Sequence, residues 1–351
     1  MSSGGRPSHA YLFHGPGGAD QRSVARELAA QLLSEGSRDP DGSRARVLSG
    51  AHPDLTWVVP SGAHEILVSD IAEPVVAAAS RTPFESTRRV FVIERVDELG
   101  DEAANRMLKT LEEPARFVHL ILLTDRLSDV LPTISSRCQL VRFDAPPEQE
   151  VAAQIGSAEL ASDEALACAR LSLGDLDQAQ ELATGEGAEL RLHAERLARA
   201  TLAGEVSESQ PWTELLATVR ARGETARREL ERRAEAELEL YPARERRRLE
   251  TEWGERVRRT RRRVETRTLD LALQLVGLWY ADLAALAWGA PELVRHVNRL
   301  EVLQDEPRVD SGRLVAAIEL VEETRRRFEL NVSEDLACEA LAYRLERLLA
   351  T

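Results

Sequence analysis

FHGPGGADQRSVA, from Phe13 to Ala25, has the outline of a phosphate-binding loop without its chemical groups. A working loop, G-x-x-x-x-G-K-[ST], cradles phosphates with backbone N–H groups, contacts them through lysine and holds Mg²⁺ through a hydroxyl. Here an acid replaces the second glycine, an amide replaces the lysine and a guanidinium replaces the hydroxyl. This degenerate loop comprises Gly15, Gly18, Asp20, Gln21 and Arg22. Because an acidic side chain repels a triphosphate, we predict an ATPase-shaped protein that does not hydrolyse ATP; the alternative is an ordinary glycine-rich strand-to-helix turn.

A second block, RRVFVIERVDELGDEAANRMLKTLEEP, runs from Arg88 to Pro114. Its apolar run, Val90 to Ile93, predicts a buried parallel strand. In an ATPase such a strand ends in an Asp-Glu pair that handles Mg²⁺ and the attacking water. This chain has Glu94-Arg95 there, and a cation cannot polarise water. The next two acids, Asp97 and Glu98, are interpreted as a helix start, where carboxylates complement the helix dipole.

Periodicity predicts a chain that is α/β at its start and all-α afterwards. Residues 9–145 alternate apolar runs (YLFHG, LTWVV, VFVIE, LILLT, LVRF) with helical stretches, as in a parallel α/β domain. We therefore place an α/β domain at 1–145, a helical lid at 146–205 and a helical domain at 206–351. Within the last, Thr268 to Gly289 is largely apolar and predicts a buried helix.

Several blocks together resemble a known family. They are HAYLFHGPGG (His9 to Gly18), AHPDL (Ala51 to Leu55), the block quoted above and LPTISSRCQLVRF (Leu131 to Phe143). They resemble the delta-prime family of clamp-loader subunits of bacterial DNA polymerase III, in the AAA+ class. The resemblance implies an AAA+ domain, a lid and a collar domain through which subunits form a ring. It also implies a cytoplasmic hetero-oligomer with gamma/tau-like motor subunits and a delta-like subunit, which loads a sliding clamp on primer-template DNA.

The resemblance also implies roles for single residues. Arg137, in the Ser-Arg-Cys motif, would act as an arginine finger on the ATP of a neighbouring subunit. Thr124 occupies the first sensor position, although without a nucleotide we interpret it as a strand-end cap. Gln178 stands where the second sensor has arginine. Only eight residues precede His9, so the segment that closes over adenine is missing or the start codon is misassigned.

No cofactor is expected. Members of the family often carry a four-cysteine zinc module before the His-Pro-Asp box, but residues 36–54 contain no cysteine. A tetrahedral zinc site needs about four Cys or His ligands, which His52 alone does not supply. His52 and His64 are interpreted as polar loop residues. We therefore predict neither zinc nor ATP.

Composition favours an intracellular protein without disulfides. The three cysteines are scattered, which argues against a disulfide framework. The sequence contains no run of about 18 apolar residues, so no membrane span is predicted. The net charge of −14 is unusual for a protein that handles DNA, whose affinity comes largely from neutralised phosphates.

The charge is unevenly distributed. Residues 219–268 contain 17 arginines and 11 glutamates, a net of +6, so the remainder carries −20. One interpretation is a basic arm that touches DNA or an acidic partner; the other, favoured by alternating signs, is a solvated helical spacer with Glu/Arg pairs. We predict a charged insertion at 222–268, made of helices 222–241 and 243–268 that form a hairpin or a kink at Pro242. Leu249, Trp253, Val257 and Val264 would line its seam.

The sequence thus predicts a subunit that does not hydrolyse ATP and acts in trans through Arg137. Two alternatives stay open. A working AAA+ ATPase would need the lysine and the Asp-Glu pair that this chain lacks. A purely structural adaptor would use Arg137 only for packing or pairing.

Overall fold

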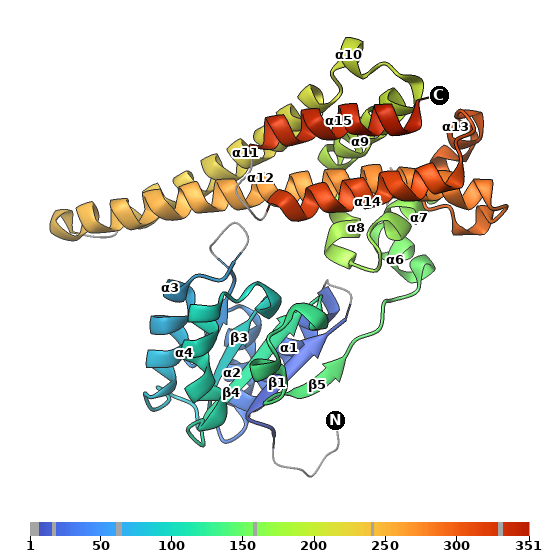
Figure 1. The fold of residues 1–351 in the computed structure, drawn as a ribbon. Helices are drawn as coiled ribbons and strands as arrows, with labels where there is room; N and C mark the ends of the chain where they lie inside the picture. Colours follow the sequence, from blue (N-terminus) through green and yellow to red (C-terminus); the bar gives the residue numbers. More distant parts are fainter. Residues whose placement is uncertain are drawn as a thin grey trace. The chain divides into compact units, whose positions relative to one another are not determined.

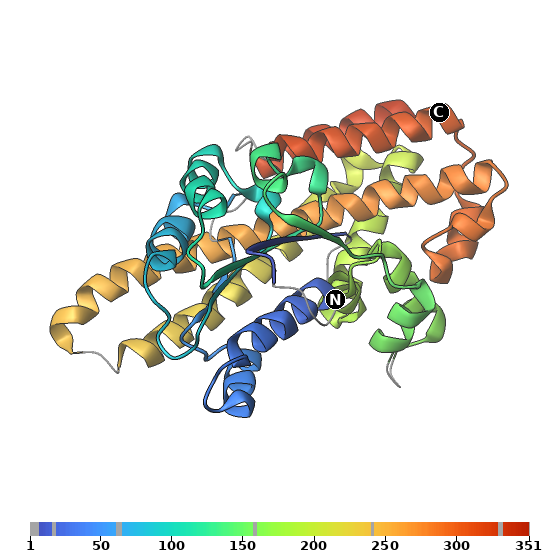
Figure 2. The same cartoon turned by 90° about the horizontal axis from the view of Figure 1, so that it is seen from below.

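The structure is a computed structural model. It describes residues 7–15, 19–60, 65–156, 160–239, 242–328 and 333–350, without the side chains at 19, 243–245, 247, 248 and 252. The chain divides into two compact units, Met1–Ala145 and Pro146–Thr351 (Figures 1 and 2). The finer division of the second unit into a lid and a collar stays a prediction.

The first unit contains a parallel five-stranded sheet with the order β2-β3-β4-β1-β5. The strands are β1 (Ala10–His14), β2 (Leu55–Val58), β3 (Arg89–Ile93), β4 (Val118–Thr124) and β5 (Gln139–Arg142). All five coincide with the apolar runs of the sequence, which confirms the predicted α/β fold class. Every residue of β4 is buried because helices cover both faces of the sheet, so the strand can be apolar throughout.

Helices pack on both faces of this sheet (Figure 1). One face is covered by α1 (Ala19–Ser34) and α2 (Pro40–Leu48), whose alanine, leucine and valine side chains pack on Phe13 and Val92. The other face is covered by α3 (Val68–Ile71), η1 (Ala72–Ala77), α4 (Asp101–Glu112) and α5 (Pro132–Ser135). Two short turns, η2 (Val96–Glu98) and η3 (Leu127–Asp129), follow β3 and β4. The carboxyl ends of β1, β3 and β4 therefore share the edge that carries the degenerate loop.

The second unit is helical where the structure describes it. It begins with α6 (Glu148–Ile155), α7 (Ser162–Leu171), α8 (Leu176–Ala183), α9 (Gly185–Ala203) and α10 (Val206–Ser209). The helix α9 ends at Gly204, whose φ of 75° is the left-handed conformation that glycine adopts most easily. It continues after the charged segment with η4 (Pro291–Leu293), η5 (Val297–Arg299), α13 (Leu300–Asp305), α14 (Ser311–Arg327) and α15 (Glu334–Leu349).

The charged segment lies on two long helices, α11 (Trp212–Leu238) and α12 (Ala243–Ala287), which run side by side as a hairpin (Figures 1 and 2). The predicted bounds of 222 and 268 were wrong, because both fall inside these helices. No Pro or other strong breaker stands at either position, so the backbone stays helical while the composition changes from apolar to charged. The charged hairpin and the predicted buried helix share α12. The seam prediction holds, with Val257 buried and Leu249, Trp253 and Val264 partly buried.

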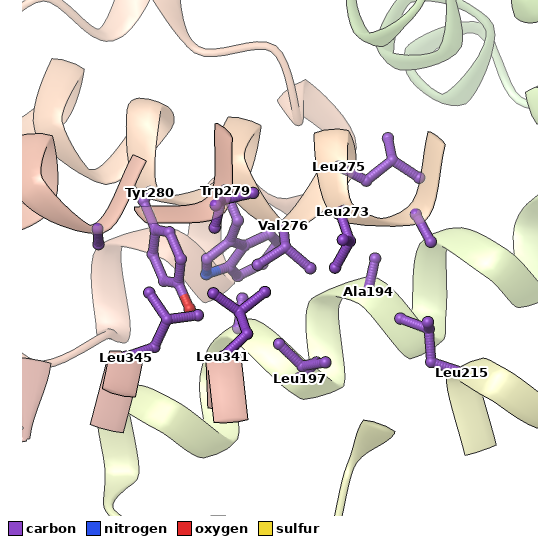
Figure 3. Packing of buried hydrophobic residues seen from close by; sticks show 14 of the residues in the cluster. Ala194, Leu197, Leu215, Leu273, Leu275, Val276, Trp279, Tyr280, Leu341 and Leu345 are labelled. Atoms are coloured by element: carbon purple, nitrogen blue, oxygen red, sulfur yellow. The ribbon is translucent and has the colours of Figure 1, made fainter. Parts of the chain in front are cut away.

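The core of the second unit forms where the apolar ends of α11 and α12 meet α9, α14 and α15 (Figure 3). Trp279 and Tyr280 are fully buried there, and the Tyr280 hydroxyl forms a 2.7 Å hydrogen bond with the Thr201 hydroxyl. By length and composition, Leu249–Ala287 contains a stretch that could cross a membrane. That stretch is 72% buried inside the protein, as expected of a core helix.

Candidate functional site

The degenerate loop leads from β1 into α1 at the carboxyl edge of the sheet. Gly15 has a φ of +144°, and a Cβ atom there would lie 2.0 Å from the Phe143 carbonyl oxygen. The backbone therefore requires glycine at this position. Gln21, in the first turn of α1, is buried and donates from Nε2 to the Gly15 carbonyl oxygen at 2.9 Å. The residue that replaces the phosphate-binding lysine thus bonds to the loop backbone. Gly18 lies outside the described residues.

The residues that replace the two metal-binding groups bond directly to each other. Arg22 Nε and Nη2 lie 3.0 and 2.8 Å from Glu94 Oε2, and the Glu94 side chain is only 8% exposed. The second oxygen, Glu94 Oε1, accepts a 2.7 Å hydrogen bond from Trp57 Nε1 on β2. The Arg26 guanidinium lies 4.8 Å from the centre of the Trp57 ring. A guanidinium and an indole N–H therefore satisfy both carboxylate oxygens.

Arg95 follows Glu94 at the end of β3 and has a φ of 53°, in the left-handed region. Its Nε lies 2.7 Å from Glu98 Oε1. The second member of the altered acid pair is therefore a cation engaged with its own turn. It offers no carboxylate that could polarise a water.

Thr124 ends β4 and organises the turn after β3. Its hydroxyl donates to Asp97 Oδ1 at 2.7 Å and accepts from the Arg126 backbone N–H at 3.0 Å. This is the strand-end role expected for Thr124. Asp97 and Glu98 lie in the first turn of a helix, as interpreted, but that helix is the short 3₁₀ helix η2, and α4 begins only at Asp101. The helix starts later because Asp97 bonds across to β4 and Glu98 to Arg95.

Among the described residues, the groups at the positions of the loop lysine, the hydroxyl ligand and the acid pair differ from those that hold a Mg²⁺–triphosphate. Asp20 is exposed at the start of α1 and carries the same sign of charge as a phosphate. Glu94 is the one carboxylate at the metal-binding positions, and the Arg22 guanidinium already neutralises it. To bind Glu94, a divalent cation would have to displace the Arg22 guanidinium. The guanidinium would then lie beside the metal with a charge of the same sign.

Arg137 lies just after α5, at the opposite end of the motif from Leu131. Its side chain is 36% exposed and its Nη2 lies 2.6 Å from Glu112 Oε1 at the end of α4. Nη1 donates to the Thr133 carbonyl oxygen at 2.9 Å. Burial raises the pKa of the neighbouring Cys138 thiol to about 11, so that thiol stays protonated at neutral pH. Arg137 is therefore both accessible and held by its own unit.

Gln178, the last predicted site residue, belongs to the second unit. It lies in the first turn of α8, where its backbone N–H bonds to the capping carboxylate of Asp175 at 2.9 Å. Its side chain is partly buried. The part of Gln178 in a nucleotide site stays a prediction.

The His-Pro-Asp box has a structural role that the sequence analysis missed. Asp54 is fully buried, and its carboxylate accepts hydrogen bonds from the backbone N–H groups of Phe84, Glu85 and Ser86 at 2.5 to 2.9 Å. His52 is buried beside it, which lowers the pKa of its imidazole. The box thus fixes the loop before β3. The signal available in the sequence was Asp54 itself, an acidic residue directly before the apolar run that forms β2. His64 lies outside the described residues.

Comparison with known proteins identifies relatives of the first unit. Residues 1–147 match the protein family described as "DNA polymerase III, delta subunit". The chain is 37% identical over 142 residues to the delta' subunit of DNA polymerase III from Bacillus subtilis, covering 39% of this chain and 43% of the relative. The corresponding subunit of Pseudomonas aeruginosa is 34% identical over 142 residues, 38% of this chain and 43% of the relative.

A third relative extends further along the chain. The delta' subunit of Escherichia coli is 28% identical over 227 residues, which cover 61% of this chain and 65% of the relative. The chain therefore aligns with about two-fifths to two-thirds of the length of these relatives. Gamma and tau subunits of DNA polymerase III match as well. These matches confirm the resemblance to the delta-prime subunit of DNA polymerase III, and residues 1–147 carry most of it.

Proposed function

We propose that this chain is a non-hydrolysing, delta-prime-like subunit of a bacterial clamp loader. It assembles in the cytoplasm with gamma/tau-like ATPase subunits and a delta-like subunit, and the complex loads a sliding clamp on primer-template DNA. By itself the chain is not an enzyme. The observation that carries this proposal is the ion pair between Arg22 and Glu94, which joins the two positions that hold Mg²⁺ in a working loop.

The ion pair supports the absence of ATP chemistry through charge and geometry. In an ATPase the cation between the hydroxyl and carboxylate positions is Mg²⁺, which neutralises the phosphates. Here the cation is a guanidinium that is tethered to α1 and already paired with Glu94. Gln21 adds no charge and is already bonded to the Gly15 carbonyl. We therefore propose that the protein binds neither ATP nor, in the absence of cysteine at residues 36–54, zinc.

Calorimetry with MgATP tests this part of the proposal. The purified chain should give no saturable heat at micromolar to millimolar nucleotide. The single variant Gln21→Lys should behave in the same way, because Asp20 and the Arg22–Glu94 pair remain. Metal analysis of the same preparation should find no stoichiometric zinc. Micromolar MgATP binding by the unaltered chain would remove the basis for a non-hydrolysing subunit and favour the working-ATPase alternative.

The second part of the proposal is that Arg137 acts in trans. A guanidinium is permanently charged and donates two parallel hydrogen bonds to phosphate oxygens, so it stabilises charge on a transferring phosphoryl group. Arginine fingers contribute about 10³–10⁵ in rate in well-studied systems, although one finger in a ring affects only one of its sites. Arg137 is 36% exposed, which leaves its guanidinium within reach of a neighbour.

A second candidate function, the structural adaptor, also has a specific observation in its favour. Arg137 is bonded to Glu112 and to the Thr133 carbonyl oxygen of its own unit. A finger has to give up the bond to Glu112 before it reaches a phosphate, whereas an adaptor uses that bond to hold α4 against α5.

Two substitutions distinguish the finger from the adaptor in a reconstituted complex. If Arg137 is a finger, Arg137→Ala lowers the DNA- and clamp-stimulated ATPase of the complex, and Glu112→Gln, which frees the guanidinium, does not. If Arg137 only packs, both substitutions remove the same ion pair and have the same effect. Arg137→Lys should restore little, because an ammonium lacks the planar fork. Wild-type clamp loading by the Arg137→Ala complex would assign the adaptor function.

A further inference from the structure

The end of α12 forms an exposed bend that is almost entirely apolar. Residues 287–293, with the sequence AWGAPEL, join α12 to η4, and we call them the apolar corner (Figure 1). All of them are exposed except Ala290, which is partly buried. Trp288 is 65% exposed and Leu293 is 59% exposed, whereas the other four tryptophans of the chain are buried or partly buried. Because tryptophan is usually one of the most buried residues, this exposure suggests a binding role.

The corner turns two large side chains outward although the core lies directly beside it. Leu286 packs against the core of the second unit and Val294 is buried in it. Trp288 and Leu293, which lie between these two, are left in water. Single exposed hydrophobic side chains are common on protein surfaces, but a concentration of them marks an interaction site.

Contacts within the second unit hold the corner in one shape. The Ala290 N–H bonds back to the last turn of α12 at 2.9 Å. From α7, Arg170 Nη1 donates to the Val294 carbonyl oxygen at 2.6 Å. Just after the corner, the buried Asp282 carboxylate accepts the His296 N–H at 2.8 Å. A rigid support lowers the entropy cost when the exposed side chains bind a partner.

Glu292 is the one charged residue of the corner, and its side chain is exposed. Among the residues that the structure describes, no cation pairs with its carboxylate. Arg170 donates to the Glu292 carbonyl oxygen at 3.4 Å but forms its ion pair with Glu148. Arg295 lies 3.6 Å from the Asp282 carboxylate instead. A carboxylate beside apolar side chains is complementary to an apolar pocket that has a cation at its edge.

The size and charge of the corner argue against a second copy of this chain as the occupant. At their exposed fractions, the Trp288 and Leu293 side chains together supply roughly 250 Å². A stable interface needs about 800 Å² from each partner. A symmetric contact centred on the corner would also bring two Glu292 carboxylates together without a cation. The corner therefore fits an anchor point on a different protein.

We propose that the apolar corner inserts Trp288 and Leu293 into an apolar pocket on a different protein, and that an arginine or lysine at the edge of that pocket pairs with Glu292. Tryptophan is enriched among the few residues that carry most of the binding energy of an interface. That this protein is a subunit of the clamp loader rests on the proposed function. The corner itself is independent of the degenerate loop and of Arg137.

Surface plasmon resonance of the full chain on an immobilised subcomplex of gamma/tau-like and delta-like subunits tests the proposal. Trp288→Ala should weaken binding about 30-fold or more, as the loss of an aromatic anchor does. Leu293→Ala should weaken it about fivefold or more. Glu292→Arg should weaken it more at low salt than at high salt, because salt screens exposed charges.

A matched control and a direct readout accompany these variants. Leu336→Ala removes a leucine of α15 that is 66% exposed, and it should bind like the unaltered chain. Circular dichroism should give equal helicity and melting for all variants, since each altered side chain is exposed. In a chain labelled with 5-fluorotryptophan, the fluorine resonance that Trp288→Phe lacks should lose its H₂O–D₂O solvent shift when the unlabelled subcomplex is added.

The outcomes separate this proposal from the proposed function. Binding of Trp288→Ala within about threefold of the unaltered chain would overturn the proposal alone, as would equal weakening by Leu336→Ala. A fluorine resonance that stays exposed to solvent in the complex would do the same. Self-association of the chain that Trp288→Ala abolishes would overturn it in favour of a second copy. Absence of binding by the unaltered chain would overturn the proposed function and this inference with it.

Discussion

The ion pair between Arg22 and Glu94 should stabilise the first unit, and a double-mutant cycle measures by how much. The Glu94 side chain is 8% exposed and the Arg22 side chain is 41% exposed, so the pair lies between the buried and the surface classes. Removing one partner of a buried pair costs about 3–5 kcal/mol. Exposed pairs contribute about 0–1 kcal/mol. For this half-exposed pair we expect a coupling free energy of about 1–2 kcal/mol.

The cycle uses Arg22→Met, Glu94→Gln and the double variant, each unfolded with urea. Trp57, which donates a 2.7 Å hydrogen bond to Glu94, is the one tryptophan of the first unit, so its unfolding is followed by fluorescence in a background in which the four tryptophans of the second unit are replaced by phenylalanine. Arg22→Met should be the most destabilising variant, because it leaves the Glu94 carboxylate buried with only the indole N–H as a partner. The double variant should recover part of that loss, since it also removes the charge.

An exposed pair in the same unit provides the control. Arg106 and Glu102 lie 3.0 Å apart on α4, with side chains 51% and 71% exposed. The same cycle there should give about 0.5 kcal/mol or less. If the two cycles give the same coupling, the Arg22–Glu94 contact is an ordinary surface pair. It would then not serve as a replacement for the metal.

Three further predictions concern stability. Asp54→Ala should destabilise the first unit by about 3 kcal/mol or more, measured by thermal unfolding, because three backbone N–H groups lose a buried charged acceptor. A melting temperature within 2 °C of the unaltered chain would contradict the role of the carboxylate, since about 3 kcal/mol corresponds to about 6–12 °C. Replacement of residues 224–266 by a short Gly/Ser linker should change the melting of the second unit little, because Val257 is one of few hydrophobic side chains buried there; a loss of cooperative melting would place the hairpin in the core. Burial lowers the pKa of both His52 and His119, so below about pH 6.5 the unfolded chain binds protons that the native state does not. The contribution of these two histidines to the free energy of unfolding is therefore fully present above pH 6.5. It is lost as the pH falls, by at most about 1.4 kcal/mol per pH unit per histidine. Equal free energies of unfolding from urea titrations at pH 5 and pH 7.5 would contradict this.

The central strands β1, β3 and β4 were predictable because each is a short apolar run and burial on both faces of a parallel sheet selects such runs, whereas the edge strand β5 is mostly exposed. The bounds of α11 and α12 were not predictable in the same way, because a helix continues through any change of side chains that leaves its backbone hydrogen bonds intact. The sequence alone also showed that Gln21, Arg22 and Glu94 each replace a residue of a working site. Their mutual contacts were not predictable, since Arg22 and Glu94 are 72 residues apart and only the pairing of β strands brings them together.

Those contacts change how the substitutions are understood. A phosphate loop that had only lost its lysine would keep a carboxylate without a cation at the end of β3, and a buried unpaired carboxylate is strongly unfavourable. Here the residue that replaces the hydroxyl ligand supplies that cation to Glu94, and the residue that replaces the lysine bonds to the loop backbone. Arg22 and Glu94 thus satisfy each other, while Gln21 satisfies the loop backbone. Restoring a single one of the three original residues would therefore break a contact without rebuilding the site.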